Sequence, residues 1–175
     1  TVTEIYDYLR LLFARVGIPH CPICGLTVNR QTTTSIVDKV YEVNKGQRVI
    51  VLAPIVIDKK GAHEHVSEKY LRAGFARARV DNVIYALDEF PELDKSKKHS
   101  IEIVIDRLVP NEESRGRLSQ SVEQALDIAE GKVKVVNADS ETEKDYSLMY
   151  ACVNHPEVLI PELEPRSFSF NSPHG

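Results

Sequence analysis

The sequence predicts an α+β domain with a mostly antiparallel sheet and several helices, preceded by a cysteine-containing flank. Several segments rich in β-branched residues read as strands, some of them alternating apolar and polar residues. Other segments repeat apolar residues every three to four positions, as amphipathic helices do. The strands outnumber those of a single crossover unit, so we expect the α+β domain to span residues 31–145.

The first part of the chain predicts two helices around a turn-rich segment. Residues 2–16 place apolar residues on one helical face, and Gly17 ends that helix. Residues 18–30 (IPHCPICGLTVNR) are rich in turn-forming residues. A short helix follows, and we expect Thr34 to cap it.

The middle of the chain predicts most of the sheet. Residues 48–57 (RVIVLAPIVI) are typical of a buried strand, and a helix is expected over 63–73. Residues 75–80 (FARARV) alternate apolar and basic residues, which predicts a strand with one charged face. Residues 83–87 would return as its hairpin partner, and residues 99–109 (HSIEIVIDRLV) predict a further strand.

The last part of the chain is more mixed. Residues 115–130 have helical spacing, and residues 132–138 (KVKVVNA) predict a strand. We expect residues 139–145 to be a polar link and residues 147–155 to contain a short strand. The last twenty residues, which are rich in proline, are expected to be extended.

Composition excludes several classes of protein. Hydrophobic residues make up 42% and charged residues 27%, as in ordinary globular domains. Lys plus Arg number 22 against 26 Asp plus Glu, and this net charge of −4 argues against a dedicated nucleic-acid-binding domain. No apolar run approaches the roughly 18 residues of a membrane span, so no membrane association is expected.

Catalytic motifs are also absent from the sequence. It has no G-x-x-x-x-G-K-S/T phosphate-binding loop and no credible catalytic set, so we do not expect an enzyme. The chain begins without Met inside a helical pattern, and we therefore expect it to be a piece of a longer protein.

The clearest local signal for a binding site is the pair Cys21 and Cys24. A two-residue spacer lets both thiolates reach one tetrahedral zinc ion, and Gly25 lets the backbone turn beside them. A redox pair is the alternative, but a thioredoxin-like dithiol would lie between a strand and a helix. An odd cysteine count also fits a reducing, cytoplasmic compartment better than a secreted disulfide framework.

A structural zinc site needs four ligands. Cys152 and His155 repeat the two-residue spacing, and we expect them to complete the site with the first pair. Two alternatives stay open. Cys152 and His155 could pair with ligands beyond Gly175, or His20 could replace one ligand.

Basic residues form the second candidate site. Arg77 and Arg79 are two residues apart on a predicted strand, so they share a face, and Lys60 and Arg107 lie in or beside other predicted strands. The planar fork of arginine suits bidentate pairing with carboxylates, which favours a protein partner. The alternatives are a solvated strand face and direct binding to nucleic-acid phosphates.

Segments at both ends and in the middle resemble the UvrA family, the DNA-damage-sensing ATPases of bacterial nucleotide excision repair. They are TVTEIYDYLRLLFARVGIPHCPICG (1–25), VIVLAPIVIDKKGAH (49–63), GFARARVD (74–81) and LEPRSFSFNSPHG (163–175). The resemblance covers the whole chain. It implies a UvrB-binding domain at residues 31–145, flanked by residues 1–30 and 146–175 from the first nucleotide-binding module.

The resemblance also implies a function, which is to recruit UvrB. The positions that match the family's charged docking surface are Arg77 and Arg107, with Arg79, Asp106 and Lys60 as neighbours. Zinc would be structural, while ATP, damaged DNA and the UvrA homodimer would involve the full-length parent. An accessory DNA-binding module that uses the basic strand face is the alternative function.

Overall fold

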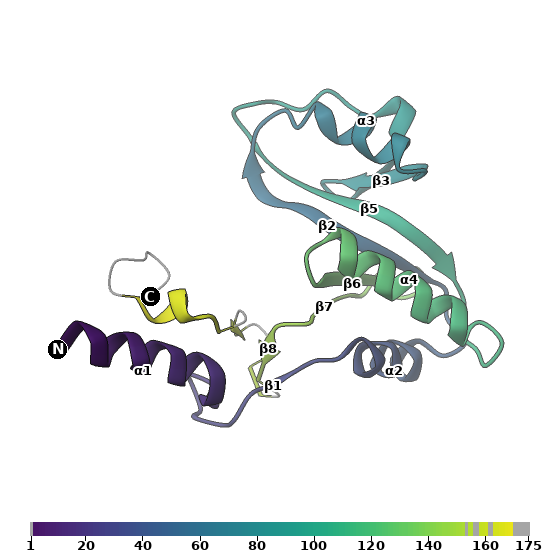
Figure 1. Ribbon diagram of the computed structural model, residues 1–175. Coiled ribbons are helices and arrows are strands. Elements are labelled where there is room, and N and C mark those ends of the chain that lie inside the picture. Colours follow the sequence, from purple (N-terminus) through teal and green to yellow (C-terminus); the bar gives the residue numbers. More distant parts are fainter. Residues whose placement is uncertain (1, 153, 156–157, 161–162, 170–175) are drawn as a thin grey trace. The chain divides into compact units, whose positions relative to one another are not determined.

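The computed structural model describes residues 2–152, 154–155, 158–160 and 163–169 (Figure 1). The chain divides into two compact units. We call Thr32–Leu148 the sheet unit, and Thr1–Gln31 together with Met149–Gly175 the flank unit. Each unit is described by itself.

The sheet unit contains a six-stranded antiparallel sheet of strand order β4-β3-β5-β2-β6-β7 (Figure 1). Its strands are β2 (Val49–Lys60), β3 (Arg77–Val80), β4 (Val83–Ala86), β5 (Lys98–Leu108), β6 (Lys132–Asn137) and β7 (Glu143–Ser147). Its helices are α2 (Thr33–Asn44), α3 (His65–Arg72), the 3-10 turn η1 (Leu87–Glu89) and α4 (Arg115–Ile128). The predicted α+β class with a mostly antiparallel sheet is confirmed.

The core of the sheet unit lies where α4 packs on the sheet. This helix packs against α2 and against β2, β5 and β6 (Figure 1). Its buried side chains include Leu118 and Val122, while Ile101 and Ile103 of β5 are fully buried in the same cluster. Apolar residues at helical spacing on α4 and at alternating positions on β5 therefore meet in one core.

A β-bulge changes the alternation near the end of β5. Val51 pairs with Asp106 and Leu52 pairs with Val104, which leaves Ile105 as the extra residue. A bulge of this kind bends the strand and redirects the side chains that follow it. The redirected residues include Asp106 and Arg107, both of which were singled out from the sequence.

The flank unit contains helix α1 (Val2–Val16) and a small antiparallel sheet of order β1-β8-β9. Its strands are β1 (Asn29–Arg30), β8 (Tyr150–Ala151) and β9 (Leu159–Ile160). A 3-10 turn, η2 (Pro165–Phe168), packs on α1, where the rings of Phe13 and Phe168 lie 5.8 Å apart.

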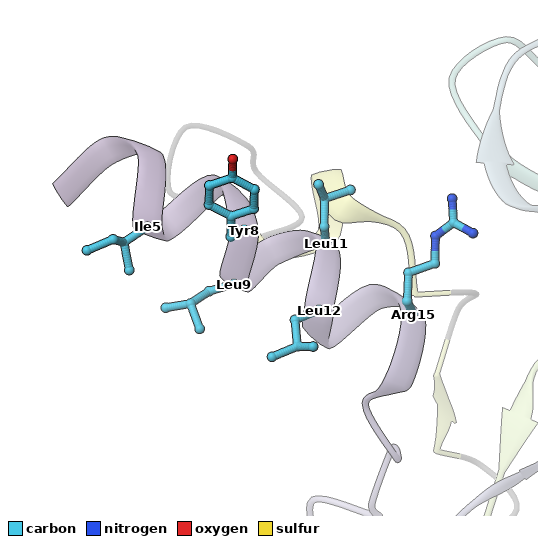
Figure 2. A pocket seen from close by; sticks show the side chains of 6 residues that line it. All are labelled: Ile5, Tyr8, Leu9, Leu11, Leu12 and Arg15. Carbon is cyan, nitrogen blue, oxygen red and sulfur yellow. The ribbon is translucent and has the colours of Figure 1, made fainter. Parts of the chain in front are cut away.

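One side of α1 is apolar and exposed. Figure 2 shows Ile5, Tyr8, Leu9, Leu11 and Leu12 along it. Ile5 is 60% exposed and Leu12 is 53% exposed, so the face predicted from the apolar spacing is only partly covered within this chain. In the described part of the chain, no helix is long and apolar enough to cross a membrane.

Three local predictions were wrong. Part of the expected polar link 139–145 forms the edge strand β7, because alternate residues there face partners across the sheet. The side chain that caps α2 is Thr32, whose oxygen accepts a hydrogen bond from Ser35 N at 3.1 Å, and not Thr34. The last twenty residues contain β9 and η2, so they are not uniformly extended. Of these twenty, residues 156–157, 161–162 and 170–175 lie outside the described residues.

Candidate functional site

The first cysteine pair lies in a tight hairpin. Cys21 N donates to Leu26 O at 2.8 Å, and Gly25 N donates back to Cys21 O at 2.8 Å. Gly25 has φ +71°, a left-handed conformation that glycine adopts without strain. This turn brings the side chains of Cys21 and Cys24 toward one point.

The second pair brings two further ligand atoms to the same point. Cys24 Sγ lies 3.5 Å from Cys152 Sγ, and His155 Nδ1 lies 3.6 Å from Cys21 Sγ and 3.8 Å from Cys152 Sγ. All four ligand atoms lie within 4.8 Å of one another. Neighbouring sulfurs around a tetrahedral zinc ion would be about 3.8 Å apart, since zinc–sulfur bonds are about 2.3 Å long. The cluster thus fits a four-coordinate zinc ion.

His20 lies outside this group of ligands. It is exposed and forms an isolated antiparallel bridge with Thr27 in the hairpin. The four-residue group does not include it, so the geometry does not favour His20 as a substitute ligand.

At Cys152 and Cys21 the environment favours the thiolate, which is the form that binds metal. At Cys24 a backbone hydrogen bond at Leu26 lowers the pKa, but burial and the neighbouring sulfurs of Cys152 and Cys21 outweigh it and raise the pKa. Burial raises the pKa of Cys152, but hydrogen bonds from the ring of His155 and from the backbone of Asn154 and His155 outweigh it and lower this pKa to about 6. A backbone hydrogen bond from Cys24 is the main cause that lowers the pKa of Cys21. Three thiolates and one imidazole form a soft donor set, typical of a closed structural zinc site.

The second candidate site is a hollow where β3 begins beside the bulge in β5. Its volume is about 390 Å³. Arg77 and Arg107 line it and are exposed. Among the described residues, neither guanidinium has a hydrogen-bond or ion-pair partner. The other lining residues are Gly74, Phe75, Ala76, Val104, Ile105, Asp106 and Arg117.

Asp106 is fixed on the helix side of the hollow. Arg117 donates to its carboxylate from Nε at 2.7 Å and Nη2 at 2.6 Å, and Ser121 Oγ donates at 2.9 Å. The amide of Arg107 donates to the same carboxylate at 2.7 Å. Burial raises the pKa of Asp106, but these bonds outweigh it and lower the pKa. Asp106 therefore anchors the end of β5 to α4.

Sequence reasoning missed Arg117. Its signal is its position four residues before Ser121, which places both side chains on one face of α4. That signal becomes specific only when the bulge turns Asp106 toward the helix.

Arg79 does not lie on the exposed part of its strand. Its side chain is 6% exposed and forms ion pairs with Glu102 of β5 and Glu143 of β7. Lys134 Nζ joins the same carboxylates, at 2.8 Å from Glu102 Oε1 and 3.4 Å from Glu143 Oε2. The expected charged face of β3 is thus split, because carboxylates from neighbouring strands enclose Arg79 and leave Arg77 exposed.

Lys60 lies away from the hollow. It is exposed at the end of β2, where it pairs in register with Lys98, while Arg107 pairs with Ile50 at the beginning of the strand. The structure therefore brings together Arg77, Asp106 and Arg107 of the predicted partner residues, and separates Lys60 from them.

Sequence comparisons match this chain to known proteins. The family model described as the UvrA interaction domain matches residues 31–139. The protein named UvrABC system protein A from Methanothermobacter thermautotrophicus is 48% identical over 178 residues, and that from Mycobacterium leprae is 46% identical over 181 residues. The Clostridium perfringens protein of the same name is 48% identical over 176 residues.

Each alignment covers 100% of this chain. The chain spans 18% of the length of the Methanothermobacter and Clostridium relatives, and 19% of that of the Mycobacterium relative. These matches and the shared interaction-domain model show that the chain belongs to the UvrA family.

Proposed function

We propose that this chain recruits UvrB to UvrA in nucleotide excision repair, through the hollow that contains Arg77 and Arg107. The observation that carries the proposal is the pair of exposed guanidiniums at one hollow of the interaction domain, neither of which has a partner within the part of the chain that the structure describes. In this proposal residues 31–145 form the docking domain. ATP hydrolysis, binding of damaged DNA and formation of the UvrA homodimer belong to the rest of the full-length protein.

The chemistry of the hollow suits an acidic partner surface. Each arginine offers a planar fork that binds a carboxylate through two hydrogen bonds. Arg117 is already paired with Asp106, so Arg77 and Arg107 supply the charge that a partner can use. Charges of this kind steer association, so docking should weaken as salt concentration rises.

We propose that zinc is structural in this chain and that its ligands are Cys21, Cys24, Cys152 and His155. The bound ion would hold the hairpin around the first pair to the segment around the second pair. In the same proposal, residues 1–30 and 146–175 are flanks of a nucleotide-binding module. The exposed apolar side of α1 would pack against other parts of that module (Figure 2).

The DNA-binding alternative has weaker support. It needs a continuous basic strand face, but Arg79 is enclosed by Glu102 and Glu143. The pairing with these carboxylates neutralises Arg79, so its charge is not available to a phosphate.

The test measures UvrB binding by calorimetry in the full-length protein, with Arg77→Ala and Arg107→Ala at two salt concentrations. Each substitution should weaken binding by about five- to thirtyfold, as expected for an arginine at the centre of an interface. Arg72→Ala is the matched control, because Arg72 is 78% exposed and pairs with Glu68 on its own helix. Lys60→Ala should also have little effect.

A parallel titration with labelled duplex DNA separates the two functions. If Arg77→Ala and Arg107→Ala weaken DNA binding and leave UvrB binding unchanged, the alternative is correct and the docking proposal is wrong.

A further inference from the structure

We propose that the docking surface continues past Arg107 into a second, apolar hollow, which holds an aliphatic or aromatic side chain that an acidic partner presents next to its carboxylates. This inference rests on the proposed function and adds the chemical character of the partner segment.

Arg107 lies between the two hollows. The second hollow has a volume of about 460 Å³, and its floor is apolar. It is lined by Arg48, Val49, Ile50, Arg107, Leu108, Val109 and Ala138. A partner group that pairs with Arg107 therefore lies at the border between the second, apolar hollow and the charged hollow.

The strand register explains this arrangement. Ile50 of β2 pairs directly with Arg107 of β5, and directly paired residues in antiparallel strands share a face. The neighbouring residues Asp106 and Leu108 point to the opposite face, where Asp106 contacts α4. The side chains of Ile50 and Arg107 thus leave the sheet next to each other on one face, and both line the second hollow.

The charge of the second hollow comes from Arg107. The other arginine, Arg48, donates to Asp139 Oδ1 from Nε at 2.9 Å and from Nη2 at 2.7 Å. That pair neutralises Arg48 and holds its side chain at the rim. Charge complementarity therefore calls for a carboxylate at Arg107, and the exposed Val109, at 38%, calls for an apolar group beside it.

Neither a purely acidic nor a purely apolar partner fits both features. An acidic segment alone would leave the apolar floor in contact with water. An apolar segment alone would cover Arg107 without a partner, and an unpaired buried charge is strongly unfavourable. A segment that alternates acidic and apolar residues satisfies the whole surface.

The test uses Val109→Ser in the full-length protein and measures UvrB binding by calorimetry over a range of temperatures. We expect binding to weaken by about three- to tenfold, because a partner contact with two methyl groups is lost. The heat-capacity change of binding should become less negative, since apolar burial is its main source. The salt dependence should stay the same, because no charge is removed.

Two further variants keep the test clear. Ala138→Glu changes an exposed residue, so the fold should tolerate it. The new carboxylate would fill the second hollow and repel an acidic partner. It should weaken binding more than Val109→Ser does. Val83→Ser is the matched control, because Val83 is also an exposed valine, at 52%, and lies on the edge strand β4.

The outcomes separate the inference from the proposed function. If Arg77→Ala and Arg107→Ala weaken UvrB binding while Val109→Ser and Ala138→Glu do not, the proposed docking function is correct and the inference of an apolar contact in the second hollow is wrong. If none of the four variants differs from Val83→Ser, the docking surface itself is wrong. The inference would also be wrong if Val109→Ser abolished self-association of the chain and left UvrB binding unchanged. The second hollow would then hold a second copy of this chain.

Discussion

Arg79 is the centre of a buried ionic network. Its guanidinium contacts Glu102 and Glu143, and Lys134 shares both carboxylates. These partners raise the pKa of Arg79 despite the opposing effect of burial, so it stays charged. A buried charge that loses its partner is strongly destabilising, and the network therefore makes the sheet unit dependent on each member.

We predict that Arg79→Ala lowers the free energy of unfolding of the sheet unit by about 3 kcal/mol, at the lower end for a broken buried ion pair, because the buried Glu102 loses the guanidinium and keeps only Lys134 as a cationic partner. The measurement is hydrogen exchange of slowly exchanging amides in β5 and β6. Arg77→Ala is the control on the same strand, and it should change stability by less than about 0.5 kcal/mol because Arg77 is exposed. Equal effects of the two variants would show that the network does not stabilise the fold.

His99 is a buried histidine with an acceptor at each ring nitrogen. Nδ1 lies 2.6 Å from Asp81 Oδ2, and Nε2 lies 3.0 Å from Asp94 O. Only the imidazolium can donate at both positions. The hydrogen bond to Asp81 is the main cause that raises the pKa of His99, with a second contribution from Asp94.

This raised pKa gives a pH dependence of known sign. The unfolded pKa is about 6.5, so the stabilisation is complete below that pH and is lost as the pH rises through the higher folded pKa. We predict that the sheet unit becomes less stable as the pH rises above about 6.5, and that His99→Gln removes most of this slope. The measurement is hydrogen exchange at several pH values, corrected for intrinsic rates.

The control for this prediction is His65→Gln, since His65 is an exposed histidine at the start of α3. It should keep the slope of the unmodified protein. An unchanged slope in His99→Gln would mean that other groups cause the pH dependence.

At the scale of elements, strands with strong apolar patterns could be predicted and those that depend on distant partners could not. The β-branched runs near residues 48–57 and 99–109 correspond to β2 and β5. They could be predicted because a buried strand is itself rich in apolar, β-branched residues. In β7, by contrast, Glu143 is polar because it faces Arg79, so the local pattern looks like a loop. The bulge at Ile105 could not be predicted from the sequence either, since it is defined by how β5 pairs with β2.

The same reasoning applies to the candidate sites. The spacing of Cys21 and Cys24 determines a local turn, so the sequence could identify them as candidate ligands, and the structure places them in one possible metal cluster with Cys152 and His155. Arg77 and Arg79 have identical local patterns, and only the carboxylates of other strands distinguish the exposed residue from the buried one.

The start of α2 provides a prediction at the element scale. Thr32 has extended backbone geometry and its side chain accepts from Ser35 N, as an N-cap residue does. We predict that Thr32→Ala lowers stability by about 1 kcal/mol, while Thr34→Ala has a much smaller effect because Thr34 lies inside the helix and is exposed. Hydrogen exchange in α2 measures both, and the reverse order would place the cap at Thr34.

At the scale of the whole molecule, the two units differ in what stabilises them. The sheet unit has a continuous apolar core between its sheet and helices. Among the described residues, the buried cluster around the candidate metal ligands is small: it contains Cys21, Val28 and Cys152, with Tyr150 and Ile160 packed against it. A core of this size cannot offset the entropy of ordering the chain around it, so in the zinc proposal the bound ion supplies much of the stability there.

This difference predicts a selective effect of metal removal. A chelator should release about one zinc ion per chain and make the amides of residues 20–28 exchange rapidly. Protection of the amides in β2 and β5 should stay unchanged, because the metal cluster and the main core belong to different units. Cys152→Ser should have the same effect without chelator, and His20→Gln should keep the metal because His20 is not in the cluster. Zinc retained by Cys152→Ser, or protection lost throughout the sheet unit, would contradict this account. The hollow proposed for docking is lined by residues of the sheet unit, so UvrB binding, if the proposal is correct, should survive metal loss.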